Sequence, residues 1–505
     1  MQSTKTPTSC NPFFVVVFLL LASSVIASAT CHVITPTGSG SMSGSDWNNA
    51  CSAFKGSCSV SSLVRGDSYY VAAGDFRPTQ YSFNTPDAAS ATITIIAPTA
   101  ANHCTDTGWN ASTMQGQAKF APMQFTTDYW ILNGSYRSTA SGNPWQDWTN
   151  ASGYGIAIDN TNAVSGFLNQ CSICFTQGGG NHSQVLYVDA KGSGSTSSSG
   201  NPCDFGVWWQ YGPFNNVYIG HSHFHDTGAA PNLLLDDISN LTLEYTWIER
   251  DFYVSNCHSE GIALRSEGNT VSNQIIRYNF VENTPGTAPF LATPGGSGGN
   301  KSNVWIYGNI TFYNQAESTG QPFGGGDGAI DFCCENNPDL NYTNVNIYNN
   351  TFANLNLNTQ GQNIVFGAGW PVTVSGLNIQ NNIWFNSSSP ASSPLTCTST
   401  LGGACINVIQ SPNYGPTTNP FINGNINSAG ADNYQLKADT PAGAALSSSS
   451  PPGCTTNVNC LNVDMNGNIR GSNGIWDQGA FQFGGSGTGG GTPPNAPSGL
   501  AAIVM

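Results

Sequence analysis

A short pattern of residues recurs along the middle of the chain and constrains its fold more than any other feature. Each copy has a small polar residue, apolar residues at alternate positions, a polar turn that often contains Asn, and a further apolar pair. The copies begin roughly 24 to 41 residues apart: NNVYIGHSHF (215–224), SNLTLEYTWI (239–248), SNQIIRYNFV (272–281), SNVWIYGNITF (302–312), TNVNIYNNTF (343–352) and SGLNIQNNIWF (375–385), with a weaker copy in DYWILNGSYR (128–137). One copy cannot bury its own apolar face, so the copies must stack into a solenoid.

The spacing inside each copy has a period of two, which predicts a β-strand with one apolar face. The Asn at the bend tolerates left-handed backbone angles, and its side-chain amide can bond to neighbouring turns. Stacked coils would place these residues in a column: Asn279, Asn309, Asn350 and Asn382.

The composition agrees with strands joined by tight turns. Glycine is abundant at 58 residues, whereas Lys and Arg together number 13 against 28 Asp and Glu. Long helices favour Glu, Lys and Arg, which are scarce here. The net charge of −15 disfavours a nucleic-acid partner, because phosphate binding needs a basic surface.

The repeat resembles that of the right-handed parallel β-helix proteins, a superfamily that includes pectate lyases and many other polysaccharide-active enzymes. The resemblance covers residues 120–390 and extends towards residue 483, where DMNGNIRGSNGIWDQGAFQF (464–483) is similar to an ending common in secreted bacterial members. It implies an all-β right-handed parallel β-helix acting on a polysaccharide. In the ending, it implies that Asp464, Arg470 and Asp477 close the structure.

The chain divides into five expected segments. The apolar run 13–22 and the A-x-A element at 27–29 predict an exported protein without membrane insertion. We expect this secreted protein to be a monomer. The segments are a signal peptide (1–29), an N-terminal cap with the first coils (30–120), the β-helix with its closing segment (121–483), a Gly/Pro linker (484–497) and the start of a truncated module (498–505).

The cysteines also favour export. Fourteen of the 15 Cys follow the signal segment, an even number that suggests disulfides. Cys397/Cys405 and Cys454/Cys460 are close enough in sequence to close local loops. Cys31, Cys51 and Cys58 could staple the N-terminal region, and Cys171/Cys174 form a CxxC whose rival interpretation is zinc binding.

A solenoid places residues one coil apart beside each other, so repeat spacing predicts contacts. His225, Glu249 and Glu282 align in successive copies. His221 aligns with Tyr245 and Tyr278, and His223 aligns with Trp247 and Phe280. Asp236 and Glu260 share the 24-residue spacing of His225 and Glu249.

The stretch HSEGIALR (258–265) concentrates titratable groups in a chain with only 8% charged residues. Together with LLLDD (233–237), it predicts the leading site. Carboxylates with a His or Arg suit acid–base chemistry on a sugar, and carboxylates alone suit Ca²⁺. The alternative is that Glu260 and Arg265 pair across coils and stabilise a turn. The candidate catalytic residues are His258, Glu260, Arg265 and Arg250, and the candidate metal ligands here are Asp236 and Asp237.

Two further stretches carry candidate residues. In HSHFHD (221–226), the repeat predicts a bend near Ser222 that separates His221 from the other two His, so sugar binding is favoured over a metal. In GGGDGAIDFCCEN (324–336), Asp327 and Asp331 could bind Ca²⁺ or substrate. The candidate substrate-binding residues are His223, His225, Glu249, Trp208, Trp209 and Tyr211, the aromatic ones offering faces on which sugars stack.

We therefore expect a secreted enzyme, a polysaccharide lyase that cleaves an acidic glycan with Ca²⁺ as a cofactor. The resemblance implies Arg250 or Arg265 as the base of such a lyase. A glycoside hydrolase on the same fold is the first alternative, and Asp236-Asp237 with His258 are reminiscent of the polygalacturonase group. The N-T-D and R-I-K elements of that group are missing, however. The second alternative is a non-catalytic glycan-binding solenoid.

Overall fold

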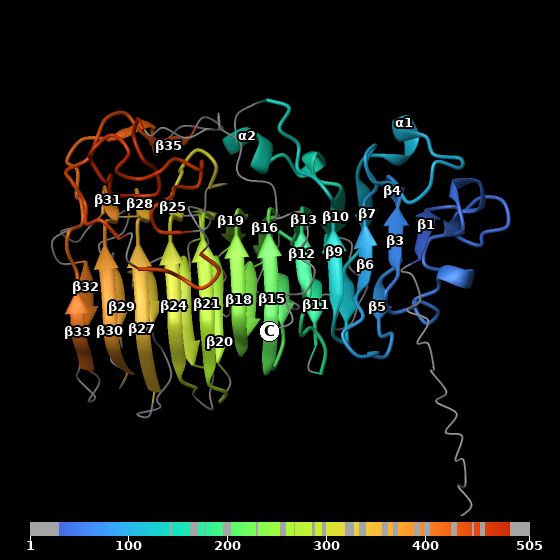
Figure 1. Ribbon diagram of the computed structural model, residues 1–505, viewed down its shortest axis with the longest axis horizontal. Helices are drawn as coiled ribbons and strands as arrows, with labels where there is room; N and C mark the ends of the chain where they lie inside the picture. The colour runs from blue at the N-terminus through green and yellow to red at the C-terminus, as the bar shows by residue number, and fades with distance from the viewer. Residues whose placement is uncertain are drawn as a thin grey trace, which may run out of the picture.

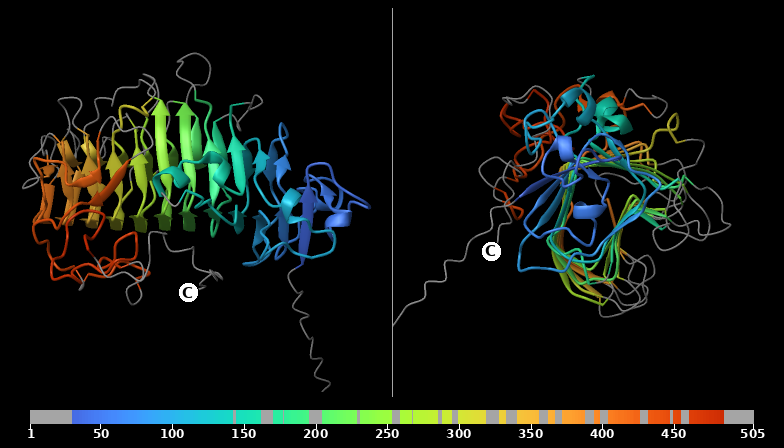
Figure 2. Two further views of the ribbon diagram at one scale, coloured as in Figure 1. Left: turned by 90° about the horizontal axis from the view of Figure 1, so that it is seen from above. Right: turned by 90° about the vertical axis from the view of Figure 1, so that its right-hand side faces the viewer.

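The computed structural model shows a right-handed parallel β-helix (Figure 1). Successive strands join sheet A, sheet B and sheet C in turn, so that each coil adds one strand to each sheet. Seen end-on, the coils superimpose into a prism (Figure 2). The structure describes residues 30–141, 144–161, 170–176, 178–194, 204–228, 231–252, 259–266, 268–284, 288–294, 299–318, 328–332, 340–355, 362–366, 372–387, 394–397, 404–425, 432–446, 449–454 and 460–484.

Within the described residues, sheet A has 13 strands, and sheets B and C have 10 each. Sheet A contains, in spatial order, β2 (Cys51–Ser52), β1 (Cys31–Thr35), β3 (Ser68–Val71), β6 (Ile93–Ile96), β9 (Trp130–Asn133), β12 (Gln184–Leu186), β15 (Phe214–Gly220), β18 (Ile238–Glu244), β21 (Val271–Arg277), β24 (Lys301–Tyr307), β27 (Leu340–Tyr348), β30 (Val372–Gln380) and β33 (Ala404–Ile409).

Sheets B and C complete each coil. Sheet B contains β4 (Gly74–Asp75), β7 (Ala118–Phe120), β10 (Ile156–Asp159), β13 (Val188–Lys191), β16 (His223–Gly228), β19 (Trp247–Phe252), β22 (Phe280–Glu282), β25 (Ile310–Phe312), β28 (Thr351–Ala353) and β31 (Ile383–Phe385). Sheet C contains β5 (Tyr81–Phe83), β8 (Met123–Phe125), β11 (Cys171–Phe175), β14 (Phe205–Trp209), β17 (Leu233–Asp236), β20 (Ile262–Ser266), β23 (Phe290–Pro294), β26 (Gly328–Phe332), β29 (Gln362–Phe366) and β32 (Leu395–Cys397).

Alternate apolar residues of all three sheets fill one continuous core inside the helix. Leu241 and Leu243 of β18 are fully buried in it, and Leu243 stacks in register between Ile219 and Ile276 of the neighbouring coils. The period-two expectation is therefore confirmed, because parallel stacking buries the apolar positions of each copy against those of the next.

The predicted Asn column is also present at the turn between sheets A and B. The side-chain amide of Asn309 donates to Asn350 Oδ1 at 3.0 Å, while its own oxygen accepts from the amide of Asn279 at 3.0 Å. Asn350 continues to Asn382 in the same way, and Asn413 ends the ladder. Each amide also donates to a backbone carbonyl of a neighbouring turn, for example Asn309 to Ile276. The ladder thus satisfies buried backbone groups that the turn leaves unpaired.

Two segments outside the coils cover the outer face of sheet B (Figures 1 and 2). The first holds α2 (Pro144–Trp148) and the 3-10 turn η3 (Ala151–Gly153). The second follows β33 and folds back over the later coils, with the hairpin β34 (Phe421–Asn423) and β35 (Asn433–Leu436). A second apolar cluster fills the space between these segments and the sheet, and it includes Trp148, Phe312 and Tyr434. The remaining helical pieces are η1 (Trp47–Asn49), η2 (Gly56–Cys58) and α1 (Ala111–Met114).

All but one of the disulfides within the described residues close short local loops. Those expected between Cys397 and Cys405 and between Cys454 and Cys460 are present. The others within the described residues join Cys31 to Cys104, Cys51 to Cys58 and Cys171 to Cys174. The CxxC is therefore a disulfide here and not a pair of zinc ligands. Disulfides fit a secreted protein. No helix within the described ranges is long and apolar enough to cross a membrane.

Candidate active site on the outer face of sheet B

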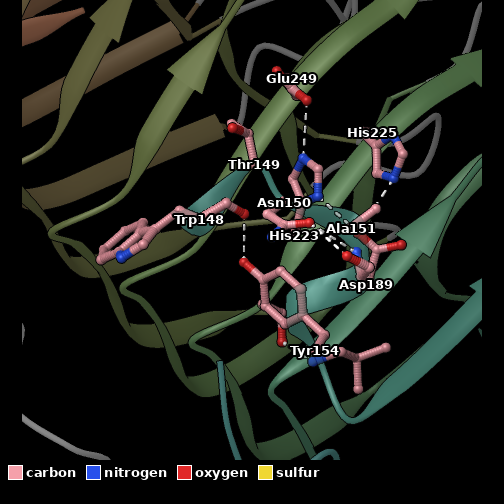
Figure 3. A network of polar contacts seen from close by, with 12 residues as sticks. Trp148, Thr149, Asn150, Ala151, Tyr154, Asp189, His223, His225 and Glu249 are labelled. Atoms are coloured by element: carbon pink, nitrogen blue, oxygen red, sulfur yellow. Dashed lines mark hydrogen bonds and ion pairs between the residues drawn. The ribbon is translucent and has the colours of Figure 1, made fainter. Parts of the chain in front are cut away.

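A network of ionisable side chains lies on the outer face of three successive sheet B strands (Figure 3). Ala190 of β13, Phe224 of β16 and Ile248 of β19 point into the core. Because side chains alternate along a strand, their neighbours in sequence point outward. We call the resulting set the sheet B cluster; it consists of Asp189, His223, His225, Asp226, Glu249 and Arg250.

Both imidazoles of the cluster lie between carboxylates. His223 Nδ1 is 2.7 Å from Asp189 Oδ1, and His223 Nε2 is 2.9 Å from Glu249 Oε1. His225 Nδ1 is 2.7 Å from Asp226 Oδ2, and its Nε2 is 3.4 Å from the same Asp189 Oδ1. The two rings stack with their centroids 4.2 Å apart and their planes 7° from parallel. The predicted bend at Ser222 is confirmed: His221 lies outside the cluster and stacks between Tyr187 and Tyr245.

Arg250 closes the network at its solvent-facing end. Its Nε is 2.7 Å from Asp226 Oδ1, and its Nη1 is 2.6 Å from Glu249 Oε1. Asp226 and Arg250 both have positive φ, 54° and 48°, at the same turn of successive coils. Their side chains are 18% and 21% exposed. The backbone turn therefore places an anchored guanidinium at the edge of an otherwise buried cluster.

The covering segment buries the inner part of the cluster. His223 is 1% exposed, and the ring of Tyr154 stacks beside it at a centroid distance of 6.1 Å (Figure 3). Tyr154 itself donates from its hydroxyl to the Trp148 carbonyl at 2.6 Å. Trp148 in turn packs edge-on against Trp247 and Phe280. The cover thus excludes water from Asp189 and His223 but leaves Arg250 at the surface.

The pKa values follow from burial and from the partners. Burial opposes ionisation of Asp189, but the His225 and His223 imidazoles outweigh it and lower the pKa of that carboxyl to about 2. Burial likewise disfavours the imidazolium of His225, yet Asp189 and Asp226 raise its pKa to about 10. Burial raises the pKa of Glu249, and Arg250 with His223 brings it below its ordinary value. At neutral pH these carboxyls are therefore ionised and His225 carries a positive charge.

A second polar group lies on the outer face of sheet C. Asp236 is fully buried, and its two oxygens accept from Arg265 Nε at 2.9 Å and Arg265 Nη2 at 3.0 Å. The same carboxylate accepts from the Trp208 indole at 3.3 Å and from the Tyr211 backbone at 3.3 Å. The Arg265 side chain is 27% exposed, and Tyr211 is 46% exposed. Four residues singled out in the sequence thus meet here.

The expected pairing of Asp236 with Glu260 does not occur. Asp236 lies opposite Arg265 in the β17–β20 register, and the backbone carbonyl of Glu260 accepts from Asn232 before the strand begins. The connection between β19 and β20 is longer than the preceding one, so the 24-residue spacing fails there. Arg265 forms an ion pair with Asp236 across these two coils.

The remaining candidates are scattered. Trp209 points into the core, where it stacks on Phe175 at 3.9 Å, so its ring is not on the outer surface. Asp331 is fully buried on β26, two strands away from Arg265 in sheet C. Asp237 accepts from the Asn269 amide at 2.9 Å. His258 and Asp327 lie outside the described residues.

Sequence reasoning missed Asp189 and Asp226 as members of the sheet B cluster. Asp226 was part of the quoted HSHFHD stretch and adjoins His225. Asp189 comes from a coil whose sequence matches the repeat poorly, yet it pairs directly with His223 in the β13–β16 register. Extending the repeat alignment one coil towards the N-terminus would have placed it there.

Two groups of described residues have a geometry suited to a metal ion. One is Asp189 with His223 and His225, and the other is Glu282 with Glu317 and Asp432. Asp236 and Asp237 fit Ca²⁺ poorly, because Arg265 already neutralises Asp236 and uses both of its oxygens. The group of Glu282, Glu317 and Asp432 offers only carboxylate oxygens, which Ca²⁺ prefers. Its Asp432 Oδ1 is buried without a hydrogen bond from any described residue.

Comparison with known proteins assigns no family to this chain. No protein-family model and no curated protein matches the sequence. The structure is similar to a pectate lyase, with a TM-score of 0.39, 11% identity and coverage of 91% of this chain and 97% of that one. It is also similar to an alginate lyase of the PL6 family, with a TM-score of 0.34, 12% identity and coverage of 71% of this chain but only 50% of that one. A third is the catalytic unit of an α-1,3-glucanase from Streptomyces thermodiastaticus, with a TM-score of 0.30, 12% identity and coverage of 77% and 69%. These are all parallel β-helix proteins.

Proposed function

We propose that this protein is a secreted polysaccharide lyase that cleaves an acidic glycan, and that the glycan binds at the Arg250 end of the sheet B cluster. One observation carries the proposal: six ionisable side chains from three successive coils converge within ion-pair distance, and their exposed end is a guanidinium. A linear polymer can lie across successive coils, where Lys191 is the register neighbour of His225 on the preceding strand.

The chemistry of β-elimination suits a cationic edge. A base removes the proton next to the uronate carboxylate, a carbon–carbon double bond forms, and the glycosidic C–O bond breaks with its electron pair going to the leaving sugar oxygen, which takes up a proton. Negative charge builds up on the uronate during this step, so a fixed cation stabilises the transition state. Arg250 offers that charge with a planar shape that matches a carboxylate. His225, which is cationic at neutral pH, reinforces it from behind. The cluster supplies the electrostatic part of the reaction, and its pKa values do not single out a base.

The same pKa values argue against hydrolysis at this cluster. A glycoside hydrolase needs one carboxyl group that stays protonated to act as the acid. The pKa values of Asp189, Asp226 and Glu249 are all lowered, because burial is outweighed by the neighbouring imidazoles and guanidinium. All three carboxyls are therefore ionised near neutral pH.

The proposed Ca²⁺ ion would bind to the group formed by Glu282, Glu317 and Asp432. Glu282 lies on β22, Glu317 follows β25, and Asp432 precedes β35 in the covering segment. Ca²⁺ held there would link the covering segment to the coils. We expect such binding to show as a higher melting temperature with Ca²⁺ than with a chelator.

A non-catalytic glycan-binding solenoid is the second candidate, and a specific observation favours it. The ions of both polar groups are paired, and Glu249 and Asp236 are almost completely buried. Tyr211, in contrast, is 46% exposed, and its backbone N–H donates to the Asp236 carboxylate that Arg265 also binds. An exposed aromatic residue and a cation that share one carboxylate are suited to holding an acidic sugar without cleaving it.

The test is activity on a panel of acidic and neutral polysaccharides, with and without Ca²⁺. New reducing ends together with ultraviolet absorbance of the double bond, on acidic glycans alone, support the lyase. Reducing ends without absorbance overturn it in favour of a hydrolase. No cleavage by the folded protein, combined with retardation in gels containing an acidic glycan, supports the binding solenoid.

Variants then locate the site. Arg250→Gln should lower kcat by about 100-fold, because a cation aimed at the developing charge is lost. Arg77→Gln is the matched control, since Arg77 is 28% exposed and also paired with two carboxylates, Asp75 and Asp159. Arg250→Lys keeps the charge. Its activity therefore shows whether the loss of activity in Arg250→Gln comes from the missing charge or from misfolding. Equal activity of the Arg250→Gln and Arg77→Gln proteins would place the site elsewhere.

A further inference from the structure

The inner side of the sheet B cluster brings together three potential ligand atoms. Asp189 Oδ1 faces His223 Nδ1 at 2.7 Å and His225 Nε2 at 3.4 Å. The ligand atoms of these three residues all lie within 4.8 Å of one another. Metal–ligand bonds of about 2.0–2.1 Å at tetrahedral or octahedral angles place neighbouring ligand atoms about 3.0–3.4 Å apart. The spacing from Asp189 to the two imidazoles brackets that range.

The far nitrogen of each imidazole is held by another carboxylate. His223 Nε2 pairs with Glu249 at 2.9 Å, and His225 Nδ1 pairs with Asp226 at 2.7 Å. Histidines that ligate metals commonly donate their other ring N–H to a carboxylate, which fixes the tautomer and strengthens the ligand. Arg250 bridges the two outer carboxylates. Both rings are thus oriented with the remaining nitrogen towards Asp189.

The net charge of the cluster also favours a bound cation. Three carboxylates and one guanidinium leave two negative charges. Imidazole protons neutralise them in the metal-free protein, and a divalent cation can do so in their place, with release of the protons from the ligating nitrogens. Two protonated rings stacked 4.2 Å apart repel each other in a buried site. His225 Nε2 is fully buried, and its contact with Asp189 Oδ1 is a long one of 3.4 Å.

We propose that Asp189, His223 and His225 bind a divalent transition-metal ion of the zinc class, oriented by Glu249 and Asp226. Two imidazole nitrogens and one carboxylate select Zn²⁺, Co²⁺ or similar ions over Ca²⁺, which prefers oxygen ligands. Imidazole lone pairs lie in the ring plane, so the ion is bound with at least one ring turned from the parallel stack about its Cβ–Cγ bond. Three protein ligands leave a coordination position for water or a substrate oxygen. The site does not depend on the lyase proposal, because metal binding needs no glycan.

The experiment is a metal titration of the tag-free, full-length secreted protein after treatment with a chelator. Calorimetry with Zn²⁺ should give one site with a dissociation constant in the micromolar range or below. Co²⁺ should produce the visible absorption bands of a nitrogen- and oxygen-ligated ion. No binding of either ion by the folded protein would overturn the proposal, whatever the activity on polysaccharides.

Variants assign the ion to these residues. His223→Gln and His225→Gln should each weaken Zn²⁺ binding by at least about 100-fold, and Glu249→Gln, which acts through His223, by about 10-fold. His221→Gln and Asp432→Asn should leave it unchanged, because neither residue belongs to the ligand set. Binding that survives both ligand variants would contradict the assignment. The Co²⁺ spectrum of the unmodified protein keeps the test decisive if a ligand variant fails to fold.

Discussion

The outer face of sheet B has two halves built on the same backbone but with opposite side-chain chemistry. One register column runs from Lys191 through His225, Glu249 and Glu282, and then continues as Phe312, Ala353 and Phe385. In the later half, the rings of Phe312 and Tyr434 pack 4.6 Å apart under the C-terminal hairpin. In the earlier half, the cover closes over ion pairs. Stacking fixes which positions face outward, and the side chains at those positions decide whether the face is a second core or a charged site.

The largest expected effect tests whether charge, and not volume, stabilises the earlier half. Glu249→Gln keeps the shape of the side chain but removes one of the two carboxylates that pair with each of His223 and Arg250. It should lower the free energy of unfolding by about 3 kcal/mol. Phe312→Leu, in the same column of the apolar half, should cost only about 1 kcal/mol. Urea unfolding followed by circular dichroism measures both, and the reverse order would break the distinction between the two halves.

A buried charge without such partners should behave in the opposite way. Lys301 is 1% exposed and aligns with the core residues Val271 and Tyr342. Its ammonium donates no hydrogen bond to any described residue. Burial lowers the pKa of Lys301 from 10.5 to about 8, against the opposing pull of Asp237 and Asp236. Lys301→Met should therefore raise the free energy of unfolding at pH 7, by up to about 3 kcal/mol.

The stability gained by Lys301→Met should depend on pH. Above pH 8 the folded state releases the Lys301 proton before the unfolded state does, so the penalty fades as the pH approaches 10.5. The advantage of Lys301→Met should shrink over the same interval in urea unfolding at several pH values. Lys191→Met, at an outward and partly exposed position, is the control and should change stability little. A constant advantage across this interval would show that packing and not charge is responsible.

The smallest effect is expected for the replacement of His221. His223, two residues along the chain, provides the comparison. His221 stacks at 4.9 Å on Tyr187 and at 5.1 Å on Tyr245, and burial with the nearby Arg137 lowers its pKa well below the ordinary value. His221→Phe should therefore change the free energy of unfolding by less than about 1 kcal/mol. His223→Phe removes a ring that two carboxylates hold, and it should cost several times more. Equal costs in thermal unfolding would mean that ring shape alone matters in this turn.

The repeat made much of the fold predictable. Alternating apolar residues and a bend Asn require stacking, so the spacing of Asn279, Asn309 and Asn350 was enough to place the ladder. It also placed Glu249 beside His225 and separated His221 from His223. The same method failed for Glu260, because a loop of changed length shifts the register between β19 and β20. Register arguments hold only where successive coils have the same length.

The sequence by itself determined the solenoid and the outward direction of His223, His225 and Glu249, because strand periodicity and repeat spacing are local properties of the chain. Tertiary structure decided which charges meet. Asp189 joins the cluster from a coil that matches the repeat poorly, and Tyr154 covers it from a segment outside the coils. Arg265 forms an ion pair with Asp236. Burial and pKa depend on such contacts between distant segments, and they have no signature in the spacing of residues along the chain.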